Sequence, residues 1–282
     1  MARKILTEQL KLQVKEDYLT NKQTLTELAI KYNLSYPTIS KILSGVPKYS
    51  KATLFNPDLN ETYFDNIDSE EKAYFIGLLI ADGNIYRSSD GSNRQDSISL
   101  TLLKEDKYVI EILKSRLKVN TTLVDDNRRS KKAVTLAIRS NKLSEALAKY
   151  GVVPNKTFKT FLPKINSIYM KDLIRGILDG DGSIRAKQTT KNNRFSKYLT
   201  ICGNHLLIQN IVDYLNINFK LKTKLTTYDY PNKQLSEFRI QAAEDIITVG
   251  NWLYQDATIY LTRKKENFDL IVEHYKSKVI PS

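Results

Sequence analysis

Two stretches of this chain repeat one pattern about a hundred residues apart. Residues 74–87 read YFIGLLIADGNIYR, and residues 173–185 read LIRGILDGDGSIR. Each begins as an apolar helix, reaches Asp-Gly and continues into a short strand. A repeat of this length predicts that the chain forms the same structural unit twice, as two related lobes.

Small side chains recur along one face of each repeated helix. In the first copy Ala73, Gly77 and Ala81 are spaced four residues apart, and in the second copy Gly176 and Gly180 are spaced in the same way. Glycine inside a helix costs roughly 0.5–1 kcal/mol relative to alanine, so it needs a reason. Two stripes of small residues that face each other would let the two helices touch along their length. The pattern therefore predicts a helix–helix interface between the lobes.

Each repeated helix also ends on an acid, Asp82 in the first copy and Asp181 in the second. If the helices pack side by side in parallel, the two carboxylates meet beside the negative ends of two helix dipoles. Both effects disfavour ionisation, and a divalent cation such as Mg²⁺ would resolve the conflict. A lone Asp-Gly is commonly a helix end followed by a turn, but its duplication beside the small-residue stripes argues against that interpretation. A metal that holds a phosphate and activates water is the usual arrangement for phosphodiester hydrolysis.

The order of predicted elements is the same in both copies. Each reads helix, strand, strand, helix, strand, strand, helix, and the strands alternate apolar and polar residues. We predict an α+β fold with two pseudo-symmetric αββαββα lobes, each sheet with one buried and one polar face. The alternative for such a polar face is a surface that is merely solvated.

A small all-α domain is predicted before the repeat. Apolar residues at helical spacing surround Asn33, which tolerates the left-handed conformation of a tight turn. The pattern resembles a helix-turn-helix, and an ordinary three-helix bundle is the alternative. In a helix-turn-helix, the outer face of the second helix would contact DNA. Its residues are Tyr36, Thr38, Ser40 and Lys41. The predicted domains are 1–45 (helix-turn-helix), 46–66 (linker), 67–160 (lobe 1) and 161–282 (lobe 2).

Charge and cysteine content narrow the setting. The chain has 44 Lys and Arg residues against 31 acids, a formal net charge of +13, which is typical of proteins that bind nucleic acid. The single cysteine, Cys202, excludes an internal disulfide and favours a reducing compartment. We expect no membrane segment and no signal peptide. The expected location is the cytoplasm, or the DNA-containing compartment of a phage, bacterial or organellar host.

The segments FIGLLIADG and IRGILDGDG resemble the two motifs of a single-chain LAGLIDADG homing endonuclease, over residues 67–275. The resemblance implies two lobes whose sheets form a saddle over a long, asymmetric double-stranded DNA target, bound by a monomer. It implies that Asp82 and Asp181, with the carbonyls of Ala81 and Gly180, bind Mg²⁺ or another divalent cation such as Mn²⁺. Ile80 stands where the first motif would carry an additional acid.

The resemblance also implies one basic residue per lobe near the scissile phosphates. Lys156 and Lys264 follow the last helix of each lobe and are the candidates. Lys159 competes for the first role, and Arg263 and Lys265 compete for the second. A solvated lysine is the alternative in both places.

Outward-facing residues of the two sheets are candidate contacts to the DNA grooves. They are Tyr86, Arg87, Ser99, Thr101, Arg139, Arg185, Lys187, Tyr198, Thr200, Lys222, Lys224, Arg239 and Gln241.

The leading hypothesis is a site-specific double-strand DNA endonuclease that leaves short 3′ overhangs, as the resemblance implies. A DNA-binding transcriptional regulator that does not cut and an intron RNA maturase that binds structured RNA are the alternatives. His205 and His274 are the only histidines, too few for a histidine-metal finger nuclease. A self-splicing intein is not expected, because the chain ends lack the residues that splicing requires.

Overall fold

A computed structural model describes residues 6–20, 23–46, 58–87, 95–126, 132–189, 194–230 and 235–279. The chain divides into two compact units, Met1–Pro57 and Asp58–Ser282.

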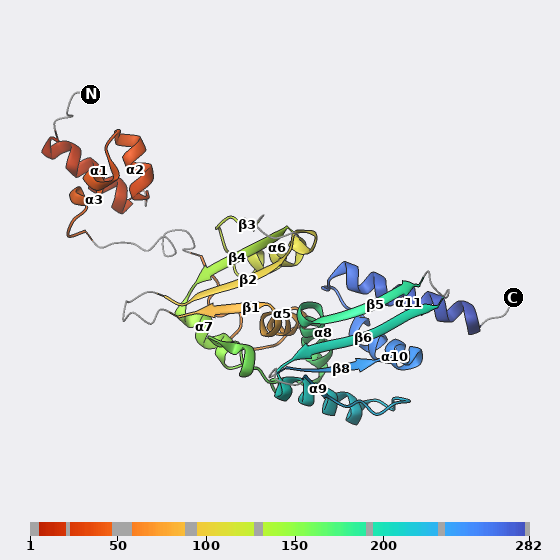
Figure 1. Ribbon diagram of the computed structural model, residues 1–282. Helices are drawn as coiled ribbons and strands as arrows, with labels where there is room; N and C mark the ends of the chain where they lie inside the picture. The colour runs from red at the N-terminus through yellow and green to blue at the C-terminus, as the bar shows by residue number, and fades with distance from the viewer. Residues whose placement is uncertain are drawn as a thin grey trace. The chain divides into compact units, whose positions relative to one another are not determined.

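The described residues of the first unit form three short helices around their own core (Figure 1). They are α1 (Glu8–Thr20), α2 (Leu25–Tyr32) and α3 (Tyr36–Ile42). A capping box starts α2, because the Thr24 side chain accepts from the Glu27 N–H while the Glu27 side chain accepts from the Thr24 N–H. Asn33 ends α2 in the left-handed conformation that the sequence predicts, at φ 50°. Ser35 precedes α3, but its hydroxyl bonds to Thr38 rather than capping the helix.

The second unit contains both predicted lobes. Lobe 1 consists of α5 (Glu70–Ala81), β1 (Gly83–Tyr86), β2 (Ser97–Leu103), α6 (Lys107–Arg116), β3 (Val124–Asp126), β4 (Ala133–Arg139) and α7 (Asn141–Ala148). Lobe 2 consists of α8 (Met170–Asp181), β5 (Gly182–Gln188), β6 (Phe195–Gly203), α9 (His205–Asn218), β7 (Tyr228–Asp229), β8 (Ser236–Ile240) and α10 (Ala243–Tyr254). The αββαββα order is confirmed in both lobes.

Each lobe forms a four-stranded antiparallel sheet with equivalent topology. The strand orders are β1-β2-β4-β3 and β5-β6-β8-β7. In β2 the residues Ile98, Leu100 and Leu102 are buried and alternate with partly exposed serine and threonine. The predicted α+β architecture, with one buried face per sheet, is therefore confirmed.

Helices α5 and α8 pack side by side between the two sheets (Figure 1). A Cβ atom at Gly77 would lie 2.1 Å from the Leu173 carbonyl oxygen, and one at Gly176 would lie 2.1 Å from the Tyr74 carbonyl oxygen. Only glycine permits this backbone-to-backbone approach. Because Gly180 correspondingly meets Ala81 and Asp82, the helices run in parallel and end together.

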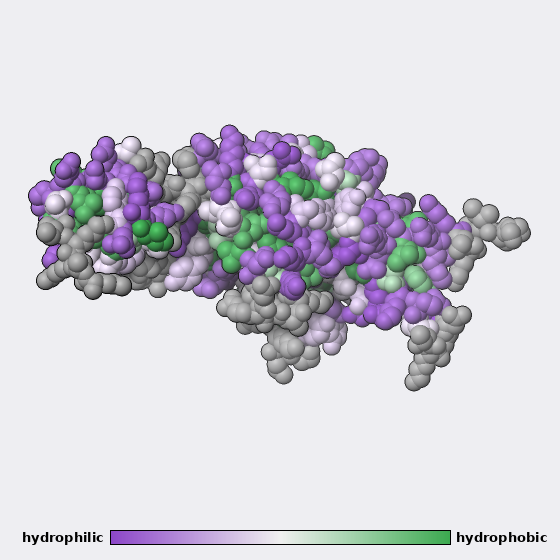
Figure 2. All heavy atoms as spheres, turned by 90° about the horizontal axis from the view of Figure 1, so that it is seen from above, coloured by the Kyte–Doolittle hydropathy of each residue, from purple (hydrophilic) through white to green (hydrophobic). Residues whose placement is uncertain are grey.

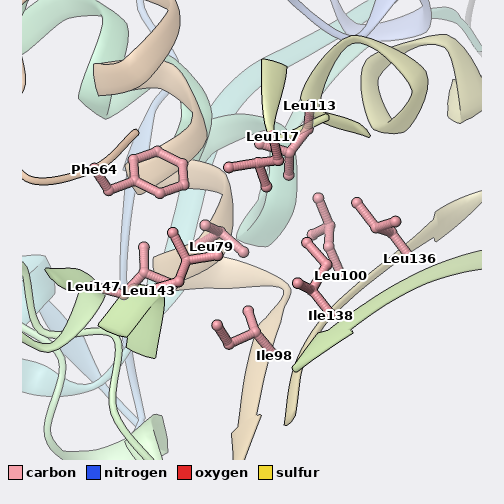
Figure 3. Close-up of a pocket in the computed structure, with 10 residues that line it drawn as sticks. All are labelled: Phe64, Leu79, Ile98, Leu100, Leu113, Leu117, Leu136, Ile138, Leu143 and Leu147. Atoms are coloured by element: carbon pink, nitrogen blue, oxygen red, sulfur yellow. The ribbon is translucent and has the colours of Figure 1, made fainter. Parts of the chain in front are cut away.

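Residues 58–66, which the sequence places in the linker, belong instead to the core of the second unit. Phe64 is 1% exposed, and Tyr63 stacks edge-to-face against it. Figure 3 shows Phe64 among aliphatic side chains from the lobe 1 sheet and from helices α5, α6 and α7. An aromatic pair buries too much apolar area to remain in a solvated linker. Residues 47–57 of the predicted linker lie outside the described residues.

Within residues 222–230, only β7 forms a strand. Asn216 pairs with both the N–H and the carbonyl of Leu225, and the Asp245 carboxylate accepts from the N–H groups of Lys222 and Thr223. Side chains from α9 and α10 therefore take the backbone groups that a strand would need for its ladder.

A further helix, α11 (Thr262–Val279), follows α10 and packs along β5. The sequence pattern alone does not separate this helix from the last part of lobe 2. Its buried Phe268 and Ile271 join the main core.

Candidate active site

The two motif acids meet at the shared C-terminal end of α5 and α8. Asp82 is the C-cap residue of α5, and Asp181 is the last residue of α8. A Cβ atom at Gly180 would lie 3.1 Å from the Asp82 Oδ2 atom, so the Asp82 carboxylate rests against α8 one residue before Asp181. The structure thus brings together the two residues that the sequence predicts would meet.

The electrostatic environment of both acids disfavours negative charge. Burial raises the pKa of Asp181 to about 6, and the nearby Asp82 carboxylate contributes in the same direction. Burial also raises the pKa of Asp82, against the opposing effects of Lys264 and Lys156. Both side chains still reach solvent, although protein surrounds them on the remaining sides. The pair is therefore open to a ligand and would gain from a cation.

Lys156 lies in the 3₁₀ turn η2 (Lys156–Phe158) of the connector between the lobes. Its Nζ donates to the carbonyl oxygens of Ile80, at 2.6 Å, and Ala81, at 2.5 Å. Burial lowers its pKa, while Asp181 and Asp82 act against that shift. The ammonium of Lys156 therefore lies at the end of α5, close to both acids.

Lys264 occupies the first turn of α11 and is almost fully buried. Its Nζ donates to three carbonyl oxygens at the end of α8, those of Leu178 and Asp179 at 2.6 Å and Gly182 at 2.7 Å. Burial lowers its pKa to about 8. These contacts hold the backbone on both sides of Asp181.

The competing basic residues have other partners or stay in solvent. Arg263 donates to Asp106 of lobe 1 at 3.0 Å, and Lys265 pairs with Asp269 at 2.6 Å. Lys159 is exposed. Lys156 and Lys264, rather than these neighbours, therefore lie at the helix ends that carry the motif acids.

Asp179, the additional acid of the second motif, is buried and bonded within the fold rather than exposed at the site. It is 1% exposed, and its Oδ2 accepts from the Tyr74 hydroxyl and the Leu261 N–H, each at 2.8 Å. Its Oδ1 has no hydrogen-bond partner among the described residues. Burial raises the pKa of Asp179 to about 6. Asp179 therefore joins the two lobes, and its counterpart Ile80 packs in the core.

Arg175 is a buried residue that the sequence analysis did not select. Its guanidinium is 0% exposed and bonds to Asp172 at 2.8 Å, to Glu70 of lobe 1 at 2.9 Å, and to the carbonyls of Leu253 and Ile259. The available signal was an arginine inside an otherwise apolar helix. Such an arginine is stable only when fully paired.

The site has a donor set that suits a hard divalent cation. It offers two carboxylates that retain access to solvent, and the carbonyls of Ala81 and Gly180 belong to the residues directly before them. Mg²⁺ commonly binds to one or two carboxylates, with waters and substrate phosphates completing its shell. Within the described ranges, no group of three or more His, Cys, Asp or Glu side chains could hold a metal. The residues therefore fit an ion that shares its coordination with a phosphate.

The outer face of the lobe 1 sheet carries mostly small and hydroxyl side chains. Tyr86 is exposed, and Ser97 pairs in register with Arg139. The hydroxyls of Thr101 and Thr135 lie 2.8 Å apart. Asn84 is exposed on the same face as Tyr86, but it is not among the predicted outward residues. The alternation around the buried Ile85 would have indicated its orientation.

The outer face of the lobe 2 sheet is more strongly charged. The Arg239 guanidinium lies over the Tyr198 ring at 4.7 Å, and Arg185 donates to Ser196. Lys187 and Gln241 are exposed, and Lys224 is exposed in the segment before β7. The predicted contacts of this lobe therefore form an aromatic and cationic surface.

Three of the predicted outward residues lie elsewhere. Arg87 pairs with the buried Asp96, since neighbours in a strand alternate and Tyr86 already faces outward. Thr200 is buried, and its hydroxyl donates to the Phe238 carbonyl. Lys222 lies in the loop before β7 and pairs with Glu244 on α10.

In the first unit, the predicted contact residues lie on α3. Tyr36 and Lys41 are exposed, whereas Thr38 and Ser40 are half-buried. On the face of the molecule shown in Figure 2, most side chains are hydrophilic. No described helix is long and apolar enough to cross a bilayer.

No model of a known protein family matches the chain. The chain is 27% identical over 114 residues to the DNA-directed RNA polymerase subunit Rpo1C of Methanocaldococcus jannaschii, a match to 40% of this chain and only 12% of that protein.

Solved structures give a broader match. The LAGLIDADG meganuclease I-AabMI bound to uncleaved DNA aligns with 73% of this chain and 91% of its own, at 11% identity and a TM-score of 0.50. The meganuclease I-SmaMI bound to uncleaveable DNA aligns with 73% of this chain and 92% of its own, at 13% identity and a TM-score of 0.51. The paired lobes, the parallel helices between them and this likeness together give the chain the fold of a LAGLIDADG endonuclease.

Proposed function

We propose that the protein is a site-specific, metal-dependent double-strand DNA endonuclease. The observation that carries the proposal is the meeting of Asp82 and Asp181 at the open end of two parallel helices, with a lysine ammonium bonded at each helix end. Nothing in folding alone favours two adjacent carboxylates there, because burial and mutual repulsion both raise the pKa of Asp181. The formal net charge of +13 suits a polyanionic substrate.

In this proposal the acids hold divalent cations, with help from the carbonyls of Ala81 and Gly180. When bound, such ions polarise the scissile phosphate and activate a water for in-line attack. Lys264 holds the turn that carries Asp181 in position. Lys156 supplies positive charge beside the scissile phosphates, where negative charge develops as the bond breaks. A pair of such sites, one per strand, would produce a double-strand break with short 3′ overhangs.

The polar outer faces of the two sheets would bind the two halves of a long, asymmetric site as a saddle. Lobe 1 offers hydroxyl, amide and tyrosyl groups, and lobe 2 offers arginine and lysine. The three-helix unit would add contacts outside the saddle as a helix-turn-helix. A single chain contains both lobes, so a monomer would suffice. The host element would be a phage, bacterial or organellar gene.

The test is cleavage of a randomised double-stranded DNA library with Mg²⁺ or Mn²⁺. Wild-type protein is expected to cut a small set of related sequences, and Asp82→Asn and Asp181→Asn are each expected to abolish double-strand cleavage while retaining binding. Chelation of the metal should have the same effect. If folded protein with metal binds one sequence tightly and never cuts it, a transcriptional regulator becomes the better proposal.

A further inference from the structure

Lys156 and Lys264 bond to different carbonyls of their helix ends. A shift of 99 residues superimposes the motifs, so that Asp82 corresponds to Asp181 and Ala81 to Gly180. Lys264 bonds to the carbonyl oxygens of Leu178, Asp179 and Gly182, but not to that of Gly180. Lys156 bonds to Ile80 and to Ala81 itself. The lobes thus differ at the carbonyl that precedes the motif acid.

This difference matters because those two carbonyls are the candidate metal ligands. An ammonium group lies 2.5 Å from the Ala81 oxygen, so this oxygen already has a cationic partner. Among the described residues, no side chain bonds to the Gly180 oxygen. A divalent cation at the lobe 1 half must therefore displace or repel Lys156, whereas one at the lobe 2 half finds its carbonyl open.

The number of donors makes the displacement feasible. An ammonium group has three N–H donors. Lys264 uses all three on backbone carbonyls, whereas Lys156 uses two within the described residues. Lys156 is also less buried than Lys264. Lys156 can therefore turn toward an incoming phosphate, whereas Lys264 is committed to the end of α8.

We propose that Lys156 serves as an internal cation at the lobe 1 half of the site, so that the two halves bind divalent cations unequally. The Asp181–Gly180 half binds first and more tightly. The Asp82–Ala81 half binds when Lys156 leaves the Ala81 carbonyl, for which a DNA phosphate is the natural alternative partner. The inference rests on the proposed function, because it assumes that these acids bind metal.

The experiment measures binding of Mn²⁺ alone to the full chain without DNA, by electron paramagnetic resonance of the free ion. Wild-type protein is expected to bind one Mn²⁺ more tightly than a second. Asp181→Asn should weaken the tight site, and Asp82→Asn should remove only the weak one. Lys156→Met should tighten the weak site at least about fivefold, since a unit charge within about 4 Å is removed.

Lys159→Met is the matched control, because it removes an exposed lysine from the same connector and should change neither affinity. If Lys156→Met does not fold, Lys156→Gln keeps an N–H donor without the charge and should give the same tightening. Failure of both folded variants to tighten the weak site overturns the inference.

Two further outcomes separate this inference from the proposed function. Two equal Mn²⁺ sites in the wild type, or loss of the tight site in Asp82→Asn, would overturn the inference and leave the endonuclease proposal standing. Mn²⁺ binding that is absent, or that persists unchanged in both Asp→Asn variants, would contradict both.

Discussion

Lys264 shows how one buried side chain can fix the geometry of a site. Its three hydrogen bonds join both sides of the turn that carries Asp181, and they satisfy carbonyls that the end of α8 leaves without helical partners. Positive charge at the negative end of a helix dipole is favourable as well. The residue therefore stabilises the fold and orients an acid at the same time.

We expect Lys264→Met to lower the free energy of unfolding by about 1–3 kcal/mol, because three buried carbonyls lose a charged donor. Denaturant unfolding measures the change. Lys159→Met, at an exposed position, should stay within about 0.5 kcal/mol of wild type. Equal stability of the two variants would show that water replaces the Lys264 contacts at no cost.

The raised pKa of Asp179 leads us to expect that the stability of the folded chain depends on pH. Its pKa in the folded chain is about 6, above the ordinary 3.8, so the folded state binds more protons than the unfolded state between about pH 4 and pH 6. Stability from this group is therefore present at low pH and is lost as the pH rises through 6. Asp179→Asn should remove this loss, because an amide can still accept from Tyr74 and Leu261.

The measurement is the free energy of unfolding at pH 4, 5, 6 and 7 for both proteins. We expect the Asn variant to gain stability relative to wild type as the pH rises, by up to about 3 kcal/mol at pH 7. Parallel profiles would mean that Asp179 titrates at its ordinary value.

At the scale of elements, the repeated motif determined most of what could be predicted. The helix–strand order, the buried faces of β2 and β4, and the meeting of Asp82 with Asp181 all follow from local periodicity and from the repeat. The position of Lys222 in a loop could not be predicted, because its contacts are made by Asp245 and Glu244 of a helix over twenty residues away. The same holds for Arg175, whose partners come from both lobes.

The contact between α5 and α8 can be tested with one methyl group. Gly77→Ala places a Cβ 2.1 Å from a backbone oxygen of α8, so the helices must move apart. We expect a loss of more than about 3 kcal/mol in stability and strongly reduced cleavage, because the two acids separate. Thermal unfolding and cleavage assays report both effects.

Gly203→Ala is the control, since its added methyl would meet side chains only at 3.4 Å, an ordinary contact. It should change stability by less than about 1 kcal/mol. Similar losses in both variants would show that helix propensity or strand propensity, rather than interhelical contact, sets the cost.

The outer face of the lobe 2 sheet leads to a further prediction. If this face binds DNA as proposed, Arg239, which lies over the Tyr198 ring, would contact guanine in the major groove. Arg239→Ala should relax the preference at one base pair by about 1–3 kcal/mol, whereas Lys187→Ala should weaken binding evenly across sequences. Selection of bound sequences from a library distinguishes the two, and an unchanged preference in Arg239→Ala would exclude direct reading by this residue.

At the scale of the whole molecule, two compact units share one chain. If α3 of the first unit contacts DNA, its exposed Lys41 neutralises a phosphate. Lys41→Gln should then reduce the slope of log affinity against log salt by about 1. Lys11→Gln, at a lysine paired with Glu8 on α1, should leave the slope unchanged. Equal slopes for wild type, Lys41→Gln and Lys11→Gln would show that Lys41 does not contact a DNA phosphate.

The polar contacts between α5 and α8 also bear on how such a chain could have arisen. Tyr74 bonds to Asp179, and Glu70 bonds to Arg175, each pair joining one lobe to the other. At the 99-residue shift, the counterpart of Tyr74 is Leu173 and the counterpart of Asp179 is Ile80. Two copies of lobe 2 would bury Asp179 against a leucine, and two copies of lobe 1 would leave the Tyr74 hydroxyl without its acid. Each lobe therefore depends on the other for a buried polar partner, so that a symmetric pair built from either lobe alone would leave a buried polar group unpaired.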